Sequence, residues 1–272
     1  GSWATVYDEA TLDLGAATVV QVRRRGKGCL SYLVGSGGAA VVIDPSADVA
    51  QYTSRAERRG WTITHVLDTH LHADHVSGAR ELATRTGAEL CLNPLDAVAY
   101  PHTALSDGQL VRVAEDVALS VSVLSTPGHT NGSTVFVLGE DAAFTGDTLF
   151  LESVGRPDLA ERAEEFAHAL YGSLHDKLLT LPDSLVVLPA HFGQVVSVHA
   201  GELVAATLGD LRARLWQLSA DEDRFVEWAV SSVAERPPNY VEIVGVNQRG
   251  TDLGATERAS LEAGPNRCAV AG

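Results

Sequence analysis

Four side chains that can bind a metal ion lie within six residues in the segment Thr69-His70-Leu71-His72-Ala73-Asp74-His75. The apolar run at residues 63–67 indicates a buried strand, and residues 76–83 indicate a helix. The segment therefore begins where a strand ends, which is where open α/β sheets bind ligands. Imidazole and carboxylate groups at this density suit zinc, iron, nickel or manganese. A polar loop that only caps the next helix would need one such residue rather than four.

Three further residues of this kind follow apolar strands in the second half of the chain. His129, in Thr126-Pro127-Gly128-His129-Thr130, follows a strand expected at 117–124. Asp147 follows a strand expected at 142–144, and His191 one expected at 185–188. Each has Gly or Pro close by, and glycine lets the backbone turn sharply near an ion. Any one of them alone would say little, but together they predict a shared metal site.

Strands and helices alternate in both halves of the chain, which predicts a layered α/β sandwich. Further strands are expected at 17–22, 31–35, 39–43, 88–92 and 133–138, and helices at 47–59 and 160–180. After residue 200 the apolar spacing becomes helical, over 202–218 and 221–233. We expect a catalytic domain at 1–200, a helical extension packed on it at 201–263, and a disordered tail at 264–272. The extension is too small to bury a core of its own.

Composition and charge restrict the possible partners. The chain has 272 residues, 45% of them hydrophobic, which is enough for a sizeable core, and a formal charge of −15. An acidic surface disfavours binding to nucleic acid, which needs clustered Lys and Arg. The one dense basic run, Arg23-Arg24-Arg25-Gly26-Lys27, is expected to be a solvated hairpin turn, with a ligand role as the alternative. The sequence has no apolar stretch of about 18 residues, so no membrane span is expected. It also has no basic and apolar leader, so the cytoplasm is the default location.

The three cysteines, Cys29, Cys91 and Cys268, lie far apart and form no CxxC pair. Such a sparse, odd set fits a reducing compartment better than a disulfide framework. We expect Cys29 and Cys91 to be inert core thiols in apolar surroundings and Cys268 to lie in the disordered tail.

The motifs HxHxDH, PGHT, TGD and PAH, in this order, resemble those of the metallo-β-lactamase superfamily over roughly residues 15–200. The resemblance implies a four-layer αβ/βα sandwich with metals in the cleft at the top of its two sheets. It also implies the ligands. One metal site matches His70, His72 and His129, the second matches Asp74, His75 and His191, and the bridging carboxylate matches Asp147.

Segments 28–33, 146–150 and 154–159 are similar to the persulfide dioxygenase branch of this superfamily, which includes rhodanese-associated relatives. That branch implies a single Fe(II) held by His70, His129 and Asp147. Two histidines and one carboxylate leave open positions for O₂ and substrate. The implied reaction oxidises a low-molecular-weight thiol persulfide, such as glutathione persulfide, to sulfite and thiol. The other candidates would then orient the ligands and bind water, with Asp74 and His75 as candidate catalytic side chains, beside His72 and His191.

Two residues are candidates for substrate binding. Arg156 is expected to form a structural ion pair with Asp158 under the site, with a direct contact to substrate as the alternative. Tyr240, after Pro237-Pro238-Asn239, either reaches the pocket from the C-terminal region or is an ordinary packing aromatic. The resemblance further implies a possible homodimer and a separate rhodanese-type sulfurtransferase as partner.

Other functions fit the same motifs. A zinc thioester hydrolase of the glyoxalase II type would use two Zn(II) ions, with Asp74 helping to orient a bridging hydroxide. Metal identity separates it from an iron dioxygenase. A nuclease of the same fold is disfavoured by the negative charge. A binding or sulfur-carrier accessory protein would keep the metal without turnover.

Overall fold

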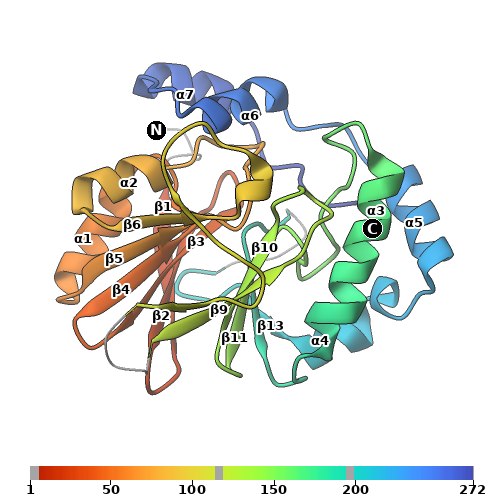
Figure 1. The fold of residues 1–272 in the computed structure, drawn as a ribbon, viewed down its shortest axis with the longest axis horizontal. Coiled ribbons are helices and arrows are strands. Elements are labelled where there is room, and N and C mark those ends of the chain that lie inside the picture. Colours follow the sequence, from red (N-terminus) through yellow and green to blue (C-terminus); the bar gives the residue numbers. More distant parts are fainter. Residues whose placement is uncertain (1–5, 114–118, 194–198, 272) are drawn as a thin grey trace.

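Two β-sheets pack face to face in the computed structural model, which describes residues 6–113, 119–193 and 199–271. The first sheet has the strand order β1-β2-β3-β4-β5-β6-β7, and the second has the order β13-β12-β11-β10-β9-β8. Helices α1 and α2 cover the outer face of the first sheet, and α3, α4 and α5 cover that of the second (Figure 1). The predicted four-layer αβ/βα sandwich is confirmed.

The elements of the described residues have the following bounds. The strands are β1 Tyr7–Asp13, β2 Thr18–Arg24, β3 Cys29–Ser36, β4 Ala39–Ile43, β5 Thr62–Leu67, β6 Glu89–Leu92, β7 Thr103–Ala104, β8 Leu110–Arg112, β9 Ser120–Ser125, β10 Thr134–Leu138, β11 Ala142–Gly146, β12 Val186–Pro189 and β13 Ala206–Thr207. The helices are α1 Ala50–Arg58, α2 Ala79–Thr86, α3 Ala163–Gly172, α4 Leu208–Arg214, α5 Glu222–Ser231, α6 Tyr240–Arg249 and α7 Ala255–Leu261. None of these helices is long and apolar enough to cross a membrane.

Parallel strands bring the polar loops to one rim. Strands β4, β5 and β6 are parallel neighbours in the first sheet, and β11 and β12 are parallel neighbours in the second. The carboxyl ends of parallel neighbours meet at the same edge, where ligands bind. Helices α6 and α7 lie across this end of the molecule (Figure 1).

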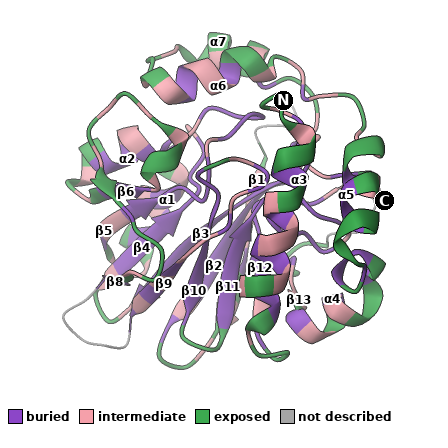
Figure 2. Ribbon diagram, turned by 45° about the vertical axis from the view of Figure 1, so that its right-hand side comes forward, coloured by how far each residue is buried: buried purple, intermediate pink, exposed green. Residues whose placement is uncertain are grey.

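The inner strands are buried on both faces. In β3, Tyr32 and Val34 face the core between the sheets, while Leu33 packs with Tyr52 of α1 and Leu82 of α2. Each fully buried side chain of this size contributes about 1.5–3 kcal/mol relative to exposure. Burial on both faces removes the alternation of exposed and buried residues, which is why nearly every position of β3 and β10 is buried (Figure 2).

Most predicted elements are present, but two helices differ from their predictions. The helix expected over 160–180 is α-helical only at Ala163–Gly172 and continues as a π-helix and a 3-10 turn to Thr180. The helix expected over 202–218 is shorter, because residues 206–207 form strand β13 beside β12 and α4 begins only at Leu208. Gln21 holds this extended segment by bonding both the N–H and the carbonyl of Val204. The strand expected at 117–124 is observed as β9, Ser120–Ser125, and residues 117 and 118 lie outside the described part of the chain.

The C-terminal segment differs from the expected disordered tail. Residues 264–271 lie along the protein as a strap: Asn266 N–H donates to the carbonyl of Lys27, and Val270 N–H to that of Val154. Cys268 and Val270 are each 1% exposed. Gly272 lies outside the described residues.

The basic run at 23–27 is also different from its prediction. Arg23 is fully buried and makes a two-pronged ion pair with Asp8, at 2.8 Å for both contacts. Lys27 is 2% exposed, and its Nζ donates to the carbonyls of Glu262 and Gly264. The prediction of a solvated turn is therefore wrong for these two residues, which anchor other segments instead.

Candidate metal centre

All seven predicted metal-binding residues come together at the rim, and each is at most 4% exposed. They arrive on four loops, which follow strands β5, β9, β11 and β12. The described structure sorts them, with their neighbours, into overlapping groups whose ligand atoms lie within 4.8 Å of one another. The first group is His70, His129 and Asp147, and the others are built around His72 and His191.

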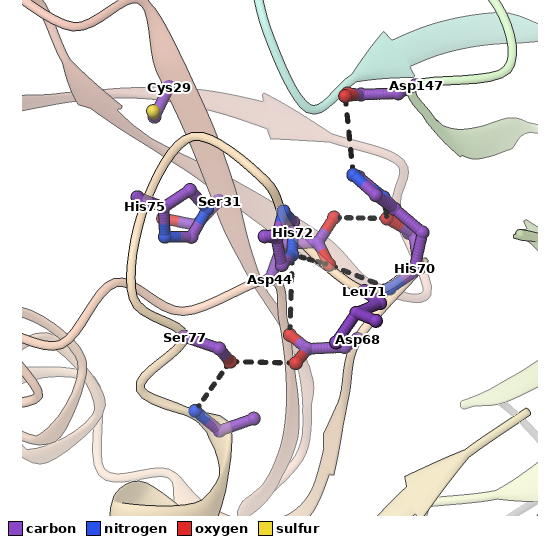
Figure 3. Close-up of polar contacts among 12 residues, drawn as sticks. Cys29, Ser31, Asp44, Asp68, His70, Leu71, His72, His75, Ser77 and Asp147 are labelled. Carbon is purple, nitrogen blue, oxygen red and sulfur yellow. Dashed lines mark hydrogen bonds and ion pairs between the residues drawn. The ribbon is translucent and has the colours of Figure 1, made fainter. Parts of the chain in front are cut away.

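The first group has three buried atoms without a hydrogen-bond partner. Nε2 of His70 and Nε2 of His129 lie 3.3 and 3.2 Å from Oδ2 of Asp147. Among the described atoms none of the three has a hydrogen-bonding partner. Figure 3 shows the His70 ring pointing toward Asp147. An unsatisfied buried polar group costs about 1–3 kcal/mol. Three of them aimed at one point therefore fit a cation.

Both histidines of this group are held with Nε2 directed inward. Nδ1 of His129 lies 2.9 Å from the carbonyl of Arg156, an acceptor, so this nitrogen donates and Nε2 keeps its lone pair. Nδ1 of His70 lies 2.9 Å from the Thr69 hydroxyl, which itself donates to Asp44. Burial, with the charges of nearby histidines, lowers the pKa of His70, which favours the neutral imidazole that binds metals. Such contacts are typical of metal-binding histidines.

His191 lies between two carboxylates. Its Nδ1 is 2.6 Å from Oδ1 of Asp147, and its Nε2 is 2.8 Å from Oδ2 of Asp74. Burial lowers the pKa of His191, but the charges of Asp147 and Asp74 outweigh it and raise the pKa well above its usual range. Burial likewise raises the pKa of Asp147, yet the imidazoles, His191 first, hold it well below the usual range.

His72 faces away from the first group. Its Nε2 lies 3.2 Å from Oδ1 of Asp44 and 3.7 Å from Oδ1 of Asp68 (Figure 3). Asp44, which directly follows strand β4, also accepts from the backbone N–H and the hydroxyl of Thr69. His72 therefore supports the loop through Asp44, while its buried Nδ1 has no partner in the described structure.

Cys29 lies beside Asp74, His75 and His191, so the prediction that its surroundings are apolar is wrong. Its Sγ donates to Oδ2 of Asp74 at 3.3 Å. Nδ1 of His75 lies 3.2 Å from the carbonyl of Val76. Burial lowers the pKa of His75 to about 4, so its imidazole is neutral.

The two candidate substrate residues are engaged with the protein itself. Arg156 forms the expected ion pair with Asp158, at 2.7 and 2.9 Å, and its other N–H groups donate to three backbone carbonyls. All five guanidinium donors are therefore used, and none is left for a substrate. The hydroxyl of Tyr240 accepts from Arg236 at 2.7 Å, within a cluster that includes Asp158.

Three residues that the sequence analysis did not assign to the site hold its loops. Asp96 accepts from the N–H groups of Leu71 and Gly132 and from the Thr130 hydroxyl, and so joins two ligand-bearing loops. Its position just after strand β6, at the same rim, was a usable signal.

The other two come from the helical extension. Asn247 of α6 donates to the carbonyls of His72 and His75, both at 2.9 Å, and accepts from Ser77 N–H. Glu262, just after α7, accepts from Val76 N–H at 2.7 Å. Neither has a local sequence signal.

Two pockets reach the cluster. One is lined by His70 and His72 together with Asp96, Tyr100 and Asn247. The other, of about 390 Å³, is lined by His191 and Cys268. The first pocket has a volume of only about 20 Å³, so only the second is large enough for more than a water molecule.

Residues 24–191 match the family described as the Metallo-beta-lactamase superfamily, and the chain belongs to it. The chain is 31% identical over 183 residues to persulfide dioxygenase ETHE1, mitochondrial, of Bos taurus, covering 65% of this chain and 69% of that protein. It is 40% identical over 128 residues to hydroxyacylglutathione hydrolase of Acidiphilium cryptum, covering 46% of this chain and 51% of that protein.

Among solved structures, ETHE1 from Myxococcus xanthus is similar, with a TM-score of 0.75 and 29% identity. The match covers 84% of this chain and 96% of that one. The chain spans only about half the length of the hydrolase it matches. The family and a metal-dependent enzyme are therefore supported, and two activities occur among the relatives.

Proposed function

We propose that this protein is an iron-dependent persulfide dioxygenase. The observation that carries the proposal is the set of three unpartnered buried atoms on His70, His129 and Asp147. Two imidazoles and one carboxylate on a single face are the ligand set of non-haem Fe(II) oxygenases. Among the described residues three ligands converge there, so positions would remain for a persulfide sulfur and O₂.

These residues would hold one Fe(II), which supplies the redox chemistry that zinc lacks. Overall, one persulfide, one O₂ and one water give one thiol, one sulfite and two protons. In this proposal His191 holds Asp147 in place through their 2.6 Å contact, and Asp44 holds His72. Asp74 and His75 are the candidates for proton handling beside the ligands.

The comparisons support this proposal because the match covers a larger part of the persulfide dioxygenases than of the hydrolases. The persulfide dioxygenase relatives match over 63–69% of their length, compared with 51–58% for the hydrolases. The proposal includes a low-molecular-weight thiol persulfide as substrate, a rhodanese-type sulfurtransferase as a separate supplier of persulfide, and a cytoplasmic location.

A dinuclear zinc thioester hydrolase is the second candidate. It is favoured by the higher identity to hydroxyacylglutathione hydrolases, and by the additional residues Asp74, His75 and His191, which offer a second metal position. Two metals would activate a water for attack on the thioester carbonyl.

Oxygen uptake by the iron-loaded protein on addition of glutathione persulfide tests the proposal. We expect rapid uptake that is lost in His129→Ala and kept in His168→Ala, because His168 is an exposed histidine paired with Glu222. Absence of uptake with iron demonstrably bound would refute the proposal for this substrate. Hydrolysis of a hydroxyacyl-glutathione thioester by the zinc-loaded protein would then favour the second candidate.

A further inference from the structure

A second group of candidate metal-binding side chains lies beside the proposed iron ligands, and it includes a residue outside the four motifs HxHxDH, PGHT, TGD and PAH. Its members are Cys29, Asp74, His75 and His191, all buried and with ligand atoms within 4.8 Å of one another. We infer that Cys29 supplies a thiolate to a second metal position, which is thereby a closed site with four protein ligands suited to Zn(II). This inference concerns a different position from the proposed iron site, although both belong to one cluster. It assigns Asp74 and His75 to the zinc ion in place of the proton handling considered above.

The distance between Cys29 and Asp74 fits a tetrahedral ion. With zinc–ligand distances of about 2.0–2.3 Å, ligand atoms around one ion lie roughly 3.3–3.8 Å apart. Cys29 Sγ lies 3.3 Å from Oδ2 of Asp74. Nε2 of His191 lies 2.8 Å from the same oxygen, a hydrogen-bond distance that lengthens when an ion replaces the shared proton.

Both imidazoles of the group have their other nitrogen engaged elsewhere. Nδ1 of His75 faces the Val76 carbonyl, and Nδ1 of His191 faces Asp147. Nε2 of each ring is then the nitrogen that an ion in the group would use, and that of His191 already contacts Oδ2 of Asp74. A metal-binding histidine ordinarily directs its second nitrogen to a carbonyl or carboxylate in this way.

Asp74 provides an independent indication that a ligand is missing. It is 1% exposed, and its Oδ1 has no hydrogen-bond partner among the described residues. A buried carboxylate oxygen without a partner is costly, and a cation next to it removes that cost. Thiol, imidazole and carboxylate together select Zn(II) over Mg(II) or Ca(II), which prefer oxygen ligands.

Backbone pairing fixes the thiol in this position. Cys29 forms a bridge with His191, and Leu30 N–H donates to the carbonyl of Ala190 at 2.7 Å. Figure 3 shows the Cys29 sulfur near His75. Four protein ligands complete the coordination of zinc, so this position would be structural, whereas the three-ligand iron position stays open. Metal binding would release the thiol proton of Cys29.

The third buried thiol nearby provides an internal alternative. Cys268, on the strap, has its Sγ within 4.8 Å of Asp147 and His191 but groups with neither Asp74 nor His75. Cys91 is also buried, and its nearest acceptor is the Glu89 carbonyl at 3.9 Å. Cys29 is therefore the residue to test, Cys268 is the alternative thiolate ligand, and Cys91 is the matched control.

Cobalt(II) titration of the metal-free protein tests the inference without measuring turnover. We expect two equivalents to bind, with a sulfur-to-cobalt charge-transfer band in the near ultraviolet. Cys29→Ser should abolish this band and weaken binding of one equivalent by at least about 10-fold, whereas Cys91→Ser and Cys268→Ser should keep the band. X-ray absorption of the zinc-loaded protein should show one sulfur at about 2.3 Å. Cys29→Ala, matched to Cys91→Ala, repeats the test if the serine variant does not fold.

Two results would overturn the inference. One is that the wild-type protein shows no thiolate band, whether it binds two equivalents of cobalt or is saturated by a single equivalent. The other is a band that survives in Cys29→Ser and disappears in Cys268→Ser. Oxygen uptake without a thiolate band would leave the proposed function intact, and a thiolate band without oxygen uptake would refute that function alone.

Discussion

The two loops that carry the metal ligands are held in different ways. The HxHxDH loop (residues 68–77) is bonded by distant segments, since Asp44, Asn247 and Glu262 contact its backbone or side chains. The His129 loop (residues 126–133) combines bonds of its own, such as Thr126 N–H to the Ser133 carbonyl, with bonds to Asp96 and to the Arg156 carbonyl. These partners lie outside the C-terminal extension. One half of the metal centre therefore depends on the C-terminal extension far more than the other.

Removing the negative charge of Asp158, whose partner Arg156 holds the C-terminal extension, should have the largest effect on stability. In Asp158→Asn the Arg156 guanidinium, which donates to carbonyls of 234, 235 and 267, loses its charged partner. Leaving one partner of a buried pair alone costs about 3–5 kcal/mol. Chemical unfolding at neutral pH measures this loss. A loss below about 1 kcal/mol would show that the extension is attached by other contacts.

The same carboxylate makes the effect depend on pH. Burial raises the pKa of Asp158, but hydrogen bonds and the charge of Arg156 outweigh it and lower the pKa in the folded protein. A lowered pKa means that its contribution to stability is complete above the unfolded-state pKa of about 3.9 and is lost as the pH falls through the folded-state pKa. The stability difference between wild type and Asp158→Asn should therefore shrink below about pH 4. A constant difference in unfolding measured down to acid pH would contradict this assignment.

Asn247→Ala should loosen the HxHxDH loop. It removes two donors to the carbonyls of His72 and His75 and one acceptor for Ser77 N–H, all in a residue that is 5% exposed. Supporting contacts of metal ligands typically contribute about 10–100-fold to affinity. Iron affinity, measured by competition with a chelator, should fall within that range. An unchanged affinity would mean that the loop keeps its shape without α6.

Ser133→Ala is the matched change in the His129 loop and should have the smallest effect. The hydroxyl accepts from Thr130 N–H at 3.0 Å, but the loop keeps its bonds to Asp96 and its other backbone bonds. The loss should be about 1 kcal/mol, with a smaller fall in iron affinity than in Asn247→Ala. A larger effect than that of Asn247→Ala would reverse the comparison between the two loops.

The metal-binding residues were predictable, whereas most residues that hold them were not. His70, His129, Asp147 and His191 each follow an apolar strand, and such strands can be recognised in the sequence. In an α/β sheet the carboxyl ends of these strands meet at one rim, so the residues that follow them come together. Asn247 and Glu262 act through backbone groups 172 and 186 residues away, and such contacts leave no periodic pattern. The strap at 264–271 was missed because its apolar residues are few and its position depends on backbone hydrogen bonds.

The contact between Glu262 and Val76 has a consequence for biosynthesis. The two residues are 186 positions apart, so at about 5–20 residues per second the ribosome needs roughly 10–40 s to make the chain between them. During that interval the HxHxDH loop exists without two of its anchors, and the strap that carries Cys268 has not yet been made. A nascent chain exposed to zinc or iron would meet those ions with its ligands incompletely held. The metal-binding side chains of residues 70–75 are therefore made well before the two side chains that fix their backbone.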